Sequence, residues 1–386
     1  MDATRLLLIA AGTGLIAATY GLVRFAYGLY LVEVQDALGM GVSVAGFISS
    51  GASVVYCLGA LVGLFAATRH PRTLVIAAGL SAAASAIGMA GAPDVPAFAV
   101  FAVAGSAGAG LASPALVALL QRSATTADDP RAQTIVNAGT GPGLVAAGLL
   151  ALWLLPDWRL AWAVAGAFTL GVTALVLVAD RRGGTRGDAP APVSFPPGSW
   201  FAAHWRLLLA ALLLGVGSAA VWTYARTLLV ASGTPPVLTV VAWTALGAGG
   251  IAVMATARWT GHLGPRRAWT TAVLTVAVAT SVLTVAPNSV PLVLAACAVF
   301  GWGYVAGSGA LIGWTAQIDA ERAAAGTALL FITLVLGQAV GAAVIGALIP
   351  WTDYTVAFLV AAALTAAGAL VPALGRGARA ARPASA

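Results

Sequence analysis

Charged residues are scarce in this chain. They make up only 8% of its 386 residues, whereas hydrophobic residues make up 60%. A soluble domain carries roughly 25% charged residues, so this chain has too few of them to cover a water-exposed surface in the ordinary way. Lysine is absent, and all 19 basic residues are arginine. The net charge of +7 is spread over short loops instead of one cluster, which argues against a nucleic-acid-binding protein.

Cysteine is scarce as well. Cys57 and Cys297 both fall inside apolar segments, so no disulfide framework is expected. The polar segments contain no His/Cys/Asp spacing typical of a metal site, no nucleophile–base pair and no phosphate-binding loop. We therefore expect no metal, no cofactor and no enzymatic activity.

Long apolar runs dominate instead. They are roughly 18–26 residues long, which matches the length that an α-helix needs to cross a bilayer. They do not alternate polar and apolar residues as membrane-barrel strands do. The sequence therefore predicts an all-α membrane protein with twelve transmembrane helices. The expected spans are 6–32, 42–67, 73–92, 97–120, 134–155, 160–179, 206–230, 237–256, 268–286, 291–316, 326–349 and 355–374.

The arginines indicate an orientation. If the N-terminus is cytoplasmic, 16 of the 19 arginines fall in cytoplasmic segments. The exceptions are Arg159, in an outer loop, and Arg24 and Arg226, within spans. This distribution follows the positive-inside rule. We expect a multi-pass protein of the bacterial cytoplasmic membrane with both termini in the cytoplasm, and we interpret the N-terminal apolar run as the first span and not as a signal peptide.

An Arg-, Gly- and Pro-rich stretch lies at the middle of the chain. It predicts a flexible cytoplasmic linker over 180–205, between an N-terminal six-helix bundle (1–179) and a C-terminal six-helix bundle (206–386).

The two halves resemble each other at a nearly constant offset. "RLLLIA" at Arg5 matches "RLLLAA" at Arg206, a shift of 206 − 5 = 201. Arg24 and Arg226 differ by 202. Three glycines of the fifth span recur in the eleventh at an offset of 198: Gly139, Gly143 and Gly148 correspond to Gly337, Gly341 and Gly346. Several matches in the same order predict two pseudo-symmetric bundles.

A parallel six-plus-six repeat resembles the layout of the major facilitator superfamily of secondary transporters. The loop "GLFAATRHPR" resembles the superfamily motif between spans two and three, with Ala67 at its acidic position. In the second half, "ARWTGHLGPRR" has Gly261 at that position. "RFAYG", starting at Arg24, resembles the first span of a large bacterial branch. The resemblance implies two bundles that rock around a central site, and transport of a small solute.

The two intramembrane arginines are the strongest site candidates. Such a charge costs at least about 2.5–3.5 kcal/mol, so it should face a cavity or a partner. Tyr20, Arg24 and Tyr27 share one helix face, as do Trp222 and Arg226. We expect the two guanidinium groups to converge on one cavity and to bind a carboxylate or phosphate. Two alternatives remain open: snorkelling to the interface, or a structural pair between Arg24 and Glu33 or Asp36.

Weaker candidates complete the predicted substrate site. Asn137, Gln338, Trp302 and Tyr304 could supply hydrogen bonds or an aromatic wall, and helix packing is the alternative role for each. Every acidic residue lies in a loop or at the end of a span, and Glu33 is the nearest proton-coupling candidate. A proton-independent uniporter or an anion exchanger remains an alternative.

The sequence therefore predicts a monomeric secondary transporter in a lipid bilayer that moves a small organic anion by alternating access, with a proton or counter-anion as a second partner. The runner-up is a proton-coupled exporter of hydrophobic drugs or secondary metabolites, with both arginines structural. A membrane enzyme lacks the required motifs, and a receptor lacks a loop long enough for an effector domain.

Overall fold

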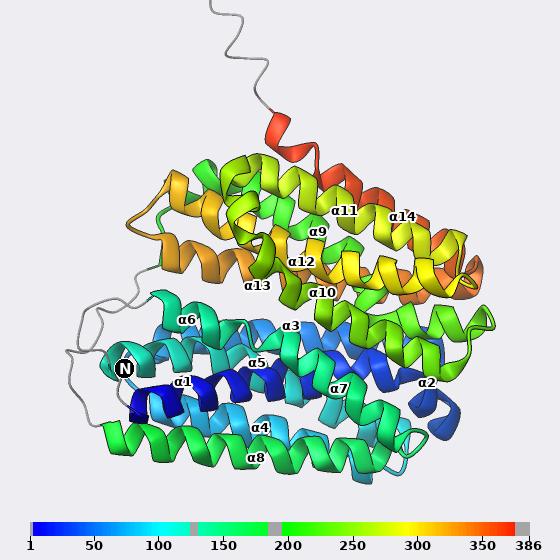
Figure 1. Cartoon of the computed structure of the whole chain (residues 1–386), viewed down its shortest axis with the longest axis horizontal. Coiled ribbons are helices and arrows are strands. Elements are labelled where there is room, and N and C mark those ends of the chain that lie inside the picture. Colours follow the sequence, from blue (N-terminus) through cyan, green and yellow to red (C-terminus); the bar gives the residue numbers. More distant parts are fainter. Residues whose placement is uncertain (1–2, 124–129, 184–194, 375–386) are drawn as a thin grey trace, which may run out of the picture.

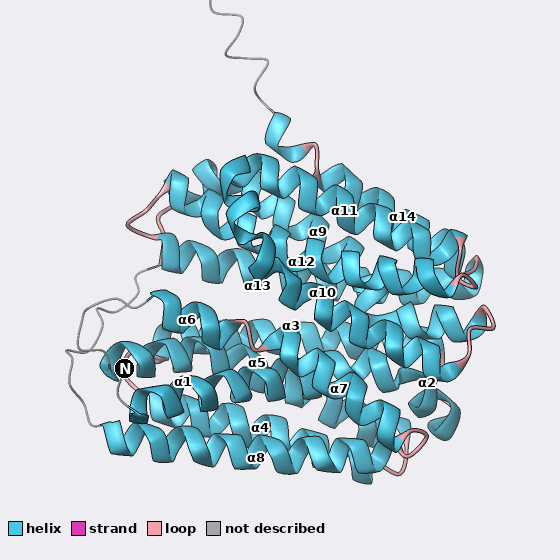
Figure 2. Ribbon diagram, in the orientation of Figure 1, coloured by secondary structure: helices cyan, strands magenta, loops and turns pink. Residues whose placement is uncertain are grey.

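The structure is a computed structural model that describes residues 3–123, 130–183 and 195–374. Every regular element in these ranges is a helix (Figure 2). The elements are α1 (Ala3–Ile16), η1 (Ala17–Phe25), α2 (Ala26–Leu38), α3 (Val42–Ala66), α4 (Pro71–Gly91), α5 (Val95–Ser123), α6 (Pro130–Asn137), α7 (Thr140–Leu154), α8 (Trp158–Gly183), α9 (Gly198–Ala231), α10 (Pro236–Leu263), α11 (Pro265–Val285), α12 (Val290–Ile318), α13 (Ala323–Leu348), η2 (Ile349–Trp351), α14 (Tyr354–Gly368) and η3 (Val371–Ala373).

Within the described residues, 12 helical segments are long and apolar enough to cross a membrane. The prediction of an all-α protein with twelve spans is confirmed. Four spans depart from their expected form. The seventh begins at Gly198, 206 − 198 = 8 residues before its expected start, and the eighth runs to Leu263, 263 − 256 = 7 residues beyond its expected end. The first runs over Thr4–Leu38 through α1, η1 and α2, beyond its expected end at residue 32. The fifth is interrupted between Asn137, where α6 ends, and Thr140, where α7 begins.

The helices form two groups that follow the order of the chain (Figure 1). Helices α1–α8 make up the lower group in this view, and α9–α14 make up the upper group. Helix α8 ends at Gly183 and α9 begins at Gly198, so both helices extend into the stretch expected as a linker. Residues 184–194 lie outside the described ranges. The division into 1–179 and 206–386 remains a prediction.

The repeated glycines have the same packing role in each half. A Cβ at Gly143 would collide with the carbonyl oxygen of Ala17 in the first span. A Cβ at Gly341 would likewise collide with the carbonyl oxygen of Val216 in the seventh. Glycine permits this backbone approach, which small residues provide in membrane helices. The fifth span thus packs on the first as the eleventh packs on the seventh.

The most extensive contacts between the two groups are those of three helix pairs: α3 with α13, α7 with α10, and α2 with α9. Near the loops 39–41 and 232–235, Ser43 Oγ donates a hydrogen bond to the Gly346 carbonyl at 2.9 Å, and the Tyr224 hydroxyl donates to the Val42 carbonyl at 3.2 Å. We call this end of the molecule the closed end. At the opposite end, α1 packs on α5, α6 and α8 of its own group.

The basic loop between the second and third spans is anchored within its own half. Arg72, at the start of α4, pairs with Asp180 near the end of α8. Arg122, near the end of α5, donates to the Thr68 carbonyl. With Ala67 at the acidic position of the motif, Arg72 has its partner on the sixth span instead of in the loop.

Large apolar side chains are widely exposed, as expected for a surface in contact with lipid. Trp153 is 89% exposed at the end of the fifth span, and Trp351 is 88% exposed at the end of the eleventh. They occupy equivalent positions in the repeat, since 351 − 153 = 198. Tryptophan is enriched where lipid headgroups meet the apolar layer, so this pair suits an interfacial anchor.

Candidate substrate-binding site

Arg24 lies deep in the first span, at the end of the π-helical segment η1. Span one continues for 38 − 24 = 14 residues beyond it to Leu38, which is roughly 21 Å of helix at 1.5 Å per residue. Within η1, the Thr19 hydroxyl donates to the Leu15 carbonyl at 2.8 Å, and Gly21 packs on the backbone of Gly143. Wide helical turns of this kind are frequent at functional sites.

Arg24 lines a pocket between the two helix groups. The pocket encloses about 530 Å³ including open solvent. Arg24 is the one charged residue in its lining. The lining residues come from the first, second, third, fourth, seventh and eleventh spans: Val23, Arg24, Phe25, Tyr27, Gly28, Ser49, Ala52, Ser53, Met89, Ala102, Ser106, Ala219, Trp222, Thr223 and Gln338.

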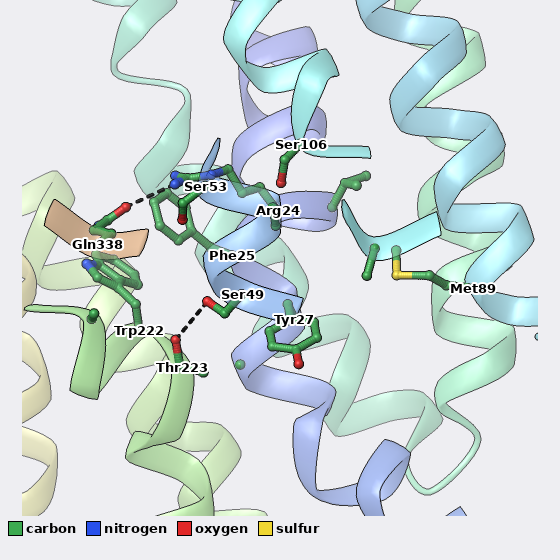
Figure 3. Close-up of a pocket in the computed structure, with 15 residues that line it drawn as sticks. Arg24, Phe25, Tyr27, Ser49, Ser53, Met89, Ser106, Trp222, Thr223 and Gln338 are labelled. Carbon is green, nitrogen blue, oxygen red and sulfur yellow. Dashed lines mark hydrogen bonds between the residues drawn. The ribbon is translucent and has the colours of Figure 1, made fainter. Parts of the chain in front are cut away.

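The partners of Arg24 are neutral. Its Nη2 donates to Gln338 Oε1 at 2.9 Å, across the two groups (Figure 3). Gln338 Nε2 in turn donates to the Tyr304 hydroxyl at 3.0 Å, which fixes the orientation of the amide. The guanidinium carbon lies 4.6 Å from the ring centroid of Tyr56 and 4.8 Å from that of Phe25. No acidic side chain in the described ranges pairs with Arg24, so its charge is uncompensated.

The aromatic candidates lie at different distances from the pocket. Tyr27 lines it and donates to the Ala45 carbonyl at 2.8 Å. Trp222 lines it and packs on Phe25 with ring centroids 4.3 Å apart. Tyr20 lies outside the lining, where its hydroxyl is 3.0 Å from that of Tyr56.

Arg226 is engaged at the closed end and does not reach the pocket in this conformation. Its Nη2 donates to Glu33 Oε1 at 2.6 Å, and its Nη1 contacts the second Glu33 oxygen and the Leu29 carbonyl. Nε donates to Thr239 Oγ1 at 3.0 Å. The side chain of Arg226 is 1% exposed and that of Glu33 is 15% exposed. The expected convergence with Arg24 is therefore not seen, because Arg226 lies at the level of Glu33.

These contacts also test the two alternative roles that the sequence left open for the arginines, snorkelling and a structural pair with Arg24. Glu33 pairs with Arg226, so the pair that was considered between Arg24 and Glu33 is not formed. Arg24 extends toward Gln338, and Arg226 is buried. Neither side chain snorkels to the membrane surface.

The remaining candidates lie outside the pocket lining. Asn137 is exposed at the end of α6, and its Oδ1 accepts from the Ser113 hydroxyl at 2.8 Å. The Trp302 indole donates to Thr256 Oγ1 at 2.8 Å. Tyr304 adjoins the pocket through its hydrogen bond to Gln338.

The sequence did not single out the hydroxyl groups of the pocket. Ser53 and Ser106 line it from the second and fourth spans. Ser49 and Thr223 also line it, and their hydroxyl oxygens are 3.0 Å apart across the two groups (Figure 3). These serines lie in Gly- and Ala-rich spans, where helix packing explains small residues equally well. Only their shared location identifies them.

Known proteins share this architecture. A sequence profile of the Major Facilitator Superfamily matches residues 13–329. The nucleoside transporter NupG superposes with a TM-score of 0.77 at 12% identity, covering 97% of this chain and 100% of that one. A D-xylose-proton symporter superposes with a TM-score of 0.75 at 14% identity, covering 95% of this chain and 96% of that one.

An auto-inhibited POT family peptide transporter superposes with a TM-score of 0.74 at 15% identity, covering 100% of this chain and 98% of that one. No curated protein sequence matches this chain. At these identities the solved structures support the fold, and the profile match supports the family. The chain belongs to the major facilitator superfamily and has the fold of its secondary transporters.

Proposed function

We propose that this protein transports a small organic anion by alternating access, with Arg24 as the group that binds the anionic end. The observation that carries the proposal is the uncompensated charge of Arg24 in a pocket between the two helix groups. A guanidinium has five N–H donors in a planar fork that matches a carboxylate or phosphate. Arg24 donates one hydrogen bond among the described residues, to a neutral amide.

The rival function is export of hydrophobic compounds, which the aromatic residues around Trp222 would suit. The ring of Trp222 contacts four other aromatic rings, those of Phe25, Trp243, Phe300 and Tyr304. A hydrophobic cation, however, would meet the positive charge of Arg24 with no acidic residue in the pocket lining to offset it. The charge of the lining therefore favours an anion.

The arginine distribution supports a cytoplasmic location for both termini in a bacterial cytoplasmic membrane. In that orientation, the closed end faces away from the cytoplasm. We also propose that a monomer is the transporting unit, because each pseudo-symmetric chain supplies both halves of the pocket.

The coupling partner belongs to the same proposal. Glu33 is the proton-coupling candidate, and it joins the two groups through Arg226 at the closed end. A proton on Glu33 would remove one charge of the pair and favour separation of α2 from α9. Exchange against a counter-anion would leave this pair ionised. Measuring transport of the anion with and without an imposed pH gradient distinguishes proton coupling from anion exchange. The measurement is made on wild type and on Glu33→Gln.

The first prediction concerns the charge of Arg24. We expect purified full-length protein to be stabilised against heat by acetate or benzoate, and not by tetraphenylphosphonium. Arg24→Gln should weaken the anion effect about tenfold or more, because a hydrogen bond to a charged group contributes about 1.5–3 kcal/mol. The measurement is the ligand concentration that gives half-maximal stabilisation.

Arg258→Gln is the matched control, since it removes one positive charge from an exposed position on α10. It should leave the anion response unchanged. Stabilisation by tetraphenylphosphonium that Arg24→Gln does not alter would reject the anion proposal and support the exporter.

A further inference from the structure

We infer that the preferred substrate is a monoanion with an aromatic body, for which a one-ring aromatic carboxylate is the simplest probe. This inference rests on the proposed function and narrows it from organic anions in general to one charge state and one shape. Two separate features of the pocket carry it: the number of available cations and the chemistry of the walls.

The pocket offers one positive charge. Arg24 is its single charged lining residue, and Arg226 is neutralised by both oxygens of Glu33 at the closed end. A monoanion would satisfy Arg24 completely. A dianion would bring a second carboxylate or phosphate charge among apolar and hydroxyl groups, and a charge buried without a partner is strongly unfavourable.

The walls beside Arg24 are aromatic. Phe25 from the first span and Trp222 from the seventh pack together across the two groups, with ring centroids 4.3 Å apart. Tyr27 lines the pocket, and Met89 from the third span provides a thioether (Figure 3). Aromatic rings pack favourably on aromatic rings, and methionine sulfur contacts them favourably. The body of the substrate is therefore expected to be planar and apolar.

Unused hydrogen-bond donors accompany the guanidinium. Trp222 is 7% exposed, and its indole Nε1 is buried without an acceptor among the described residues. The hydroxyls of Ser53 and Ser106 line the same pocket. The indole Nε1 atoms of Trp162, Trp200, Trp243 and Trp314 are likewise buried without a partner among the described residues, so this atom by itself does not indicate a ligand, and the contribution of Trp222 to the pocket is its ring.

Isothermal titration of the full-length protein in lipid nanodiscs tests the inference with four probes at neutral pH: benzoate, acetate, phthalate and benzyl alcohol. We expect benzoate to bind at least about tenfold more tightly than acetate, which lacks the ring. Benzoate should also exceed phthalate, which carries a second charge, and benzyl alcohol, which carries none, by about tenfold or more.

Trp222→Leu removes the aromatic wall and keeps an apolar side chain, so benzoate affinity should fall about threefold to tenfold. Trp243→Leu is the matched control. Its ring contacts that of Trp222, but it lies outside the pocket lining. It should leave benzoate affinity unchanged. Equal losses in both variants would assign the effect to packing and remove the indole from the site.

The outcomes separate this inference from the proposed function. Phthalate binding as tightly as benzoate would overturn the single-charge requirement, and acetate binding as tightly would overturn the aromatic body. In both cases anion binding that depends on Arg24 would leave the proposed function standing. Absence of binding by all three anions would overturn both.

Discussion

Arg24 and Arg226 are equivalent in the sequence repeat and have different environments in the protein. Arg24 donates to the amide of Gln338 and lines the pocket. Arg226 is surrounded by Glu33, the Leu29 carbonyl and Thr239, with 1% of its side chain exposed. The difference arises because Glu33 has no counterpart beside Arg24. One arginine is therefore available to a ligand, and the other joins two helices.

A double-mutant cycle tests the Glu33–Arg226 pair. Removing one partner of a buried ion pair costs about 3–5 kcal/mol, because the other charge stays buried. We expect Glu33→Gln and Arg226→Gln each to lower the thermal midpoint, and the double variant to lose less than the sum of the two. As a control, Arg24→Gln and Glu33→Gln should be additive, because they share no partner. A coupling energy for Glu33 and Arg226 below about 0.5 kcal/mol would contradict a stabilising pair.

At the scale of the helices, close backbone approach at glycines holds spans one and seven together. A Cβ at Gly28 would collide with the carbonyl oxygen of Trp222, so α2 and α9 touch there without an intervening side chain. The adjacent segment η1 is wider than an α-helix and brings Arg24 into the pocket. These two features of span one position the charge beside the contact between the groups.

Gly28→Ala tests this approach. The added methyl group should destabilise the closed end by about 1–3 kcal/mol, the usual cost of overpacking. A cysteine introduced as Thr223→Cys should then react faster with a membrane-impermeant maleimide in the Gly28→Ala protein than in the protein that keeps Gly28. Gly171→Ala is the control, because a Cβ at Gly171 meets nothing within 4 Å. An unchanged labelling rate in Gly28→Ala would show that the α2–α9 contact does not limit access.

At the scale of the whole molecule, the three pairs α3–α13, α7–α10 and α2–α9 all join helices from different groups. A pocket located between two such groups can be exposed to each side of the membrane when the groups tilt. The contact between Ser49 and Thr223 lies at the boundary, with hydroxyl oxygens 3.0 Å apart.

A reversible cross-link tests whether the groups must separate there. We expect the double variant Ser49→Cys/Thr223→Cys to lose transport after mild oxidation and to regain it after reduction. The native Cys57 and Cys297 are buried and free, so they should contribute little background. Each single variant should be insensitive to the oxidant. Full transport by the cross-linked protein would contradict separation of α3 from α9 during the cycle.

Much of the fold could be predicted from the sequence because it depends on local chemistry. A run of apolar residues of bilayer length must form its backbone hydrogen bonds internally, so it forms a helix wherever it lies. That argument gives twelve spans, and the recurrence of Gly143 as Gly341 indicates the internal symmetry. The extension of the first span to Leu38 was missed, because Glu33 and Asp36 interrupt the apolar run without ending the helix.

The sequence by itself thus determined the family, the number of spans and the presence of intramembrane charges, since hydrophobic length and motif order are properties of the chain. Only the tertiary structure decided the partners. Arg24 meets Gln338, which lies 314 positions away, and Arg226 meets Glu33, which lies 193 positions away. Both pairings depend on how helices rotate and cross, and helical periodicity alone places a residue on a face without naming the neighbour that the face contacts.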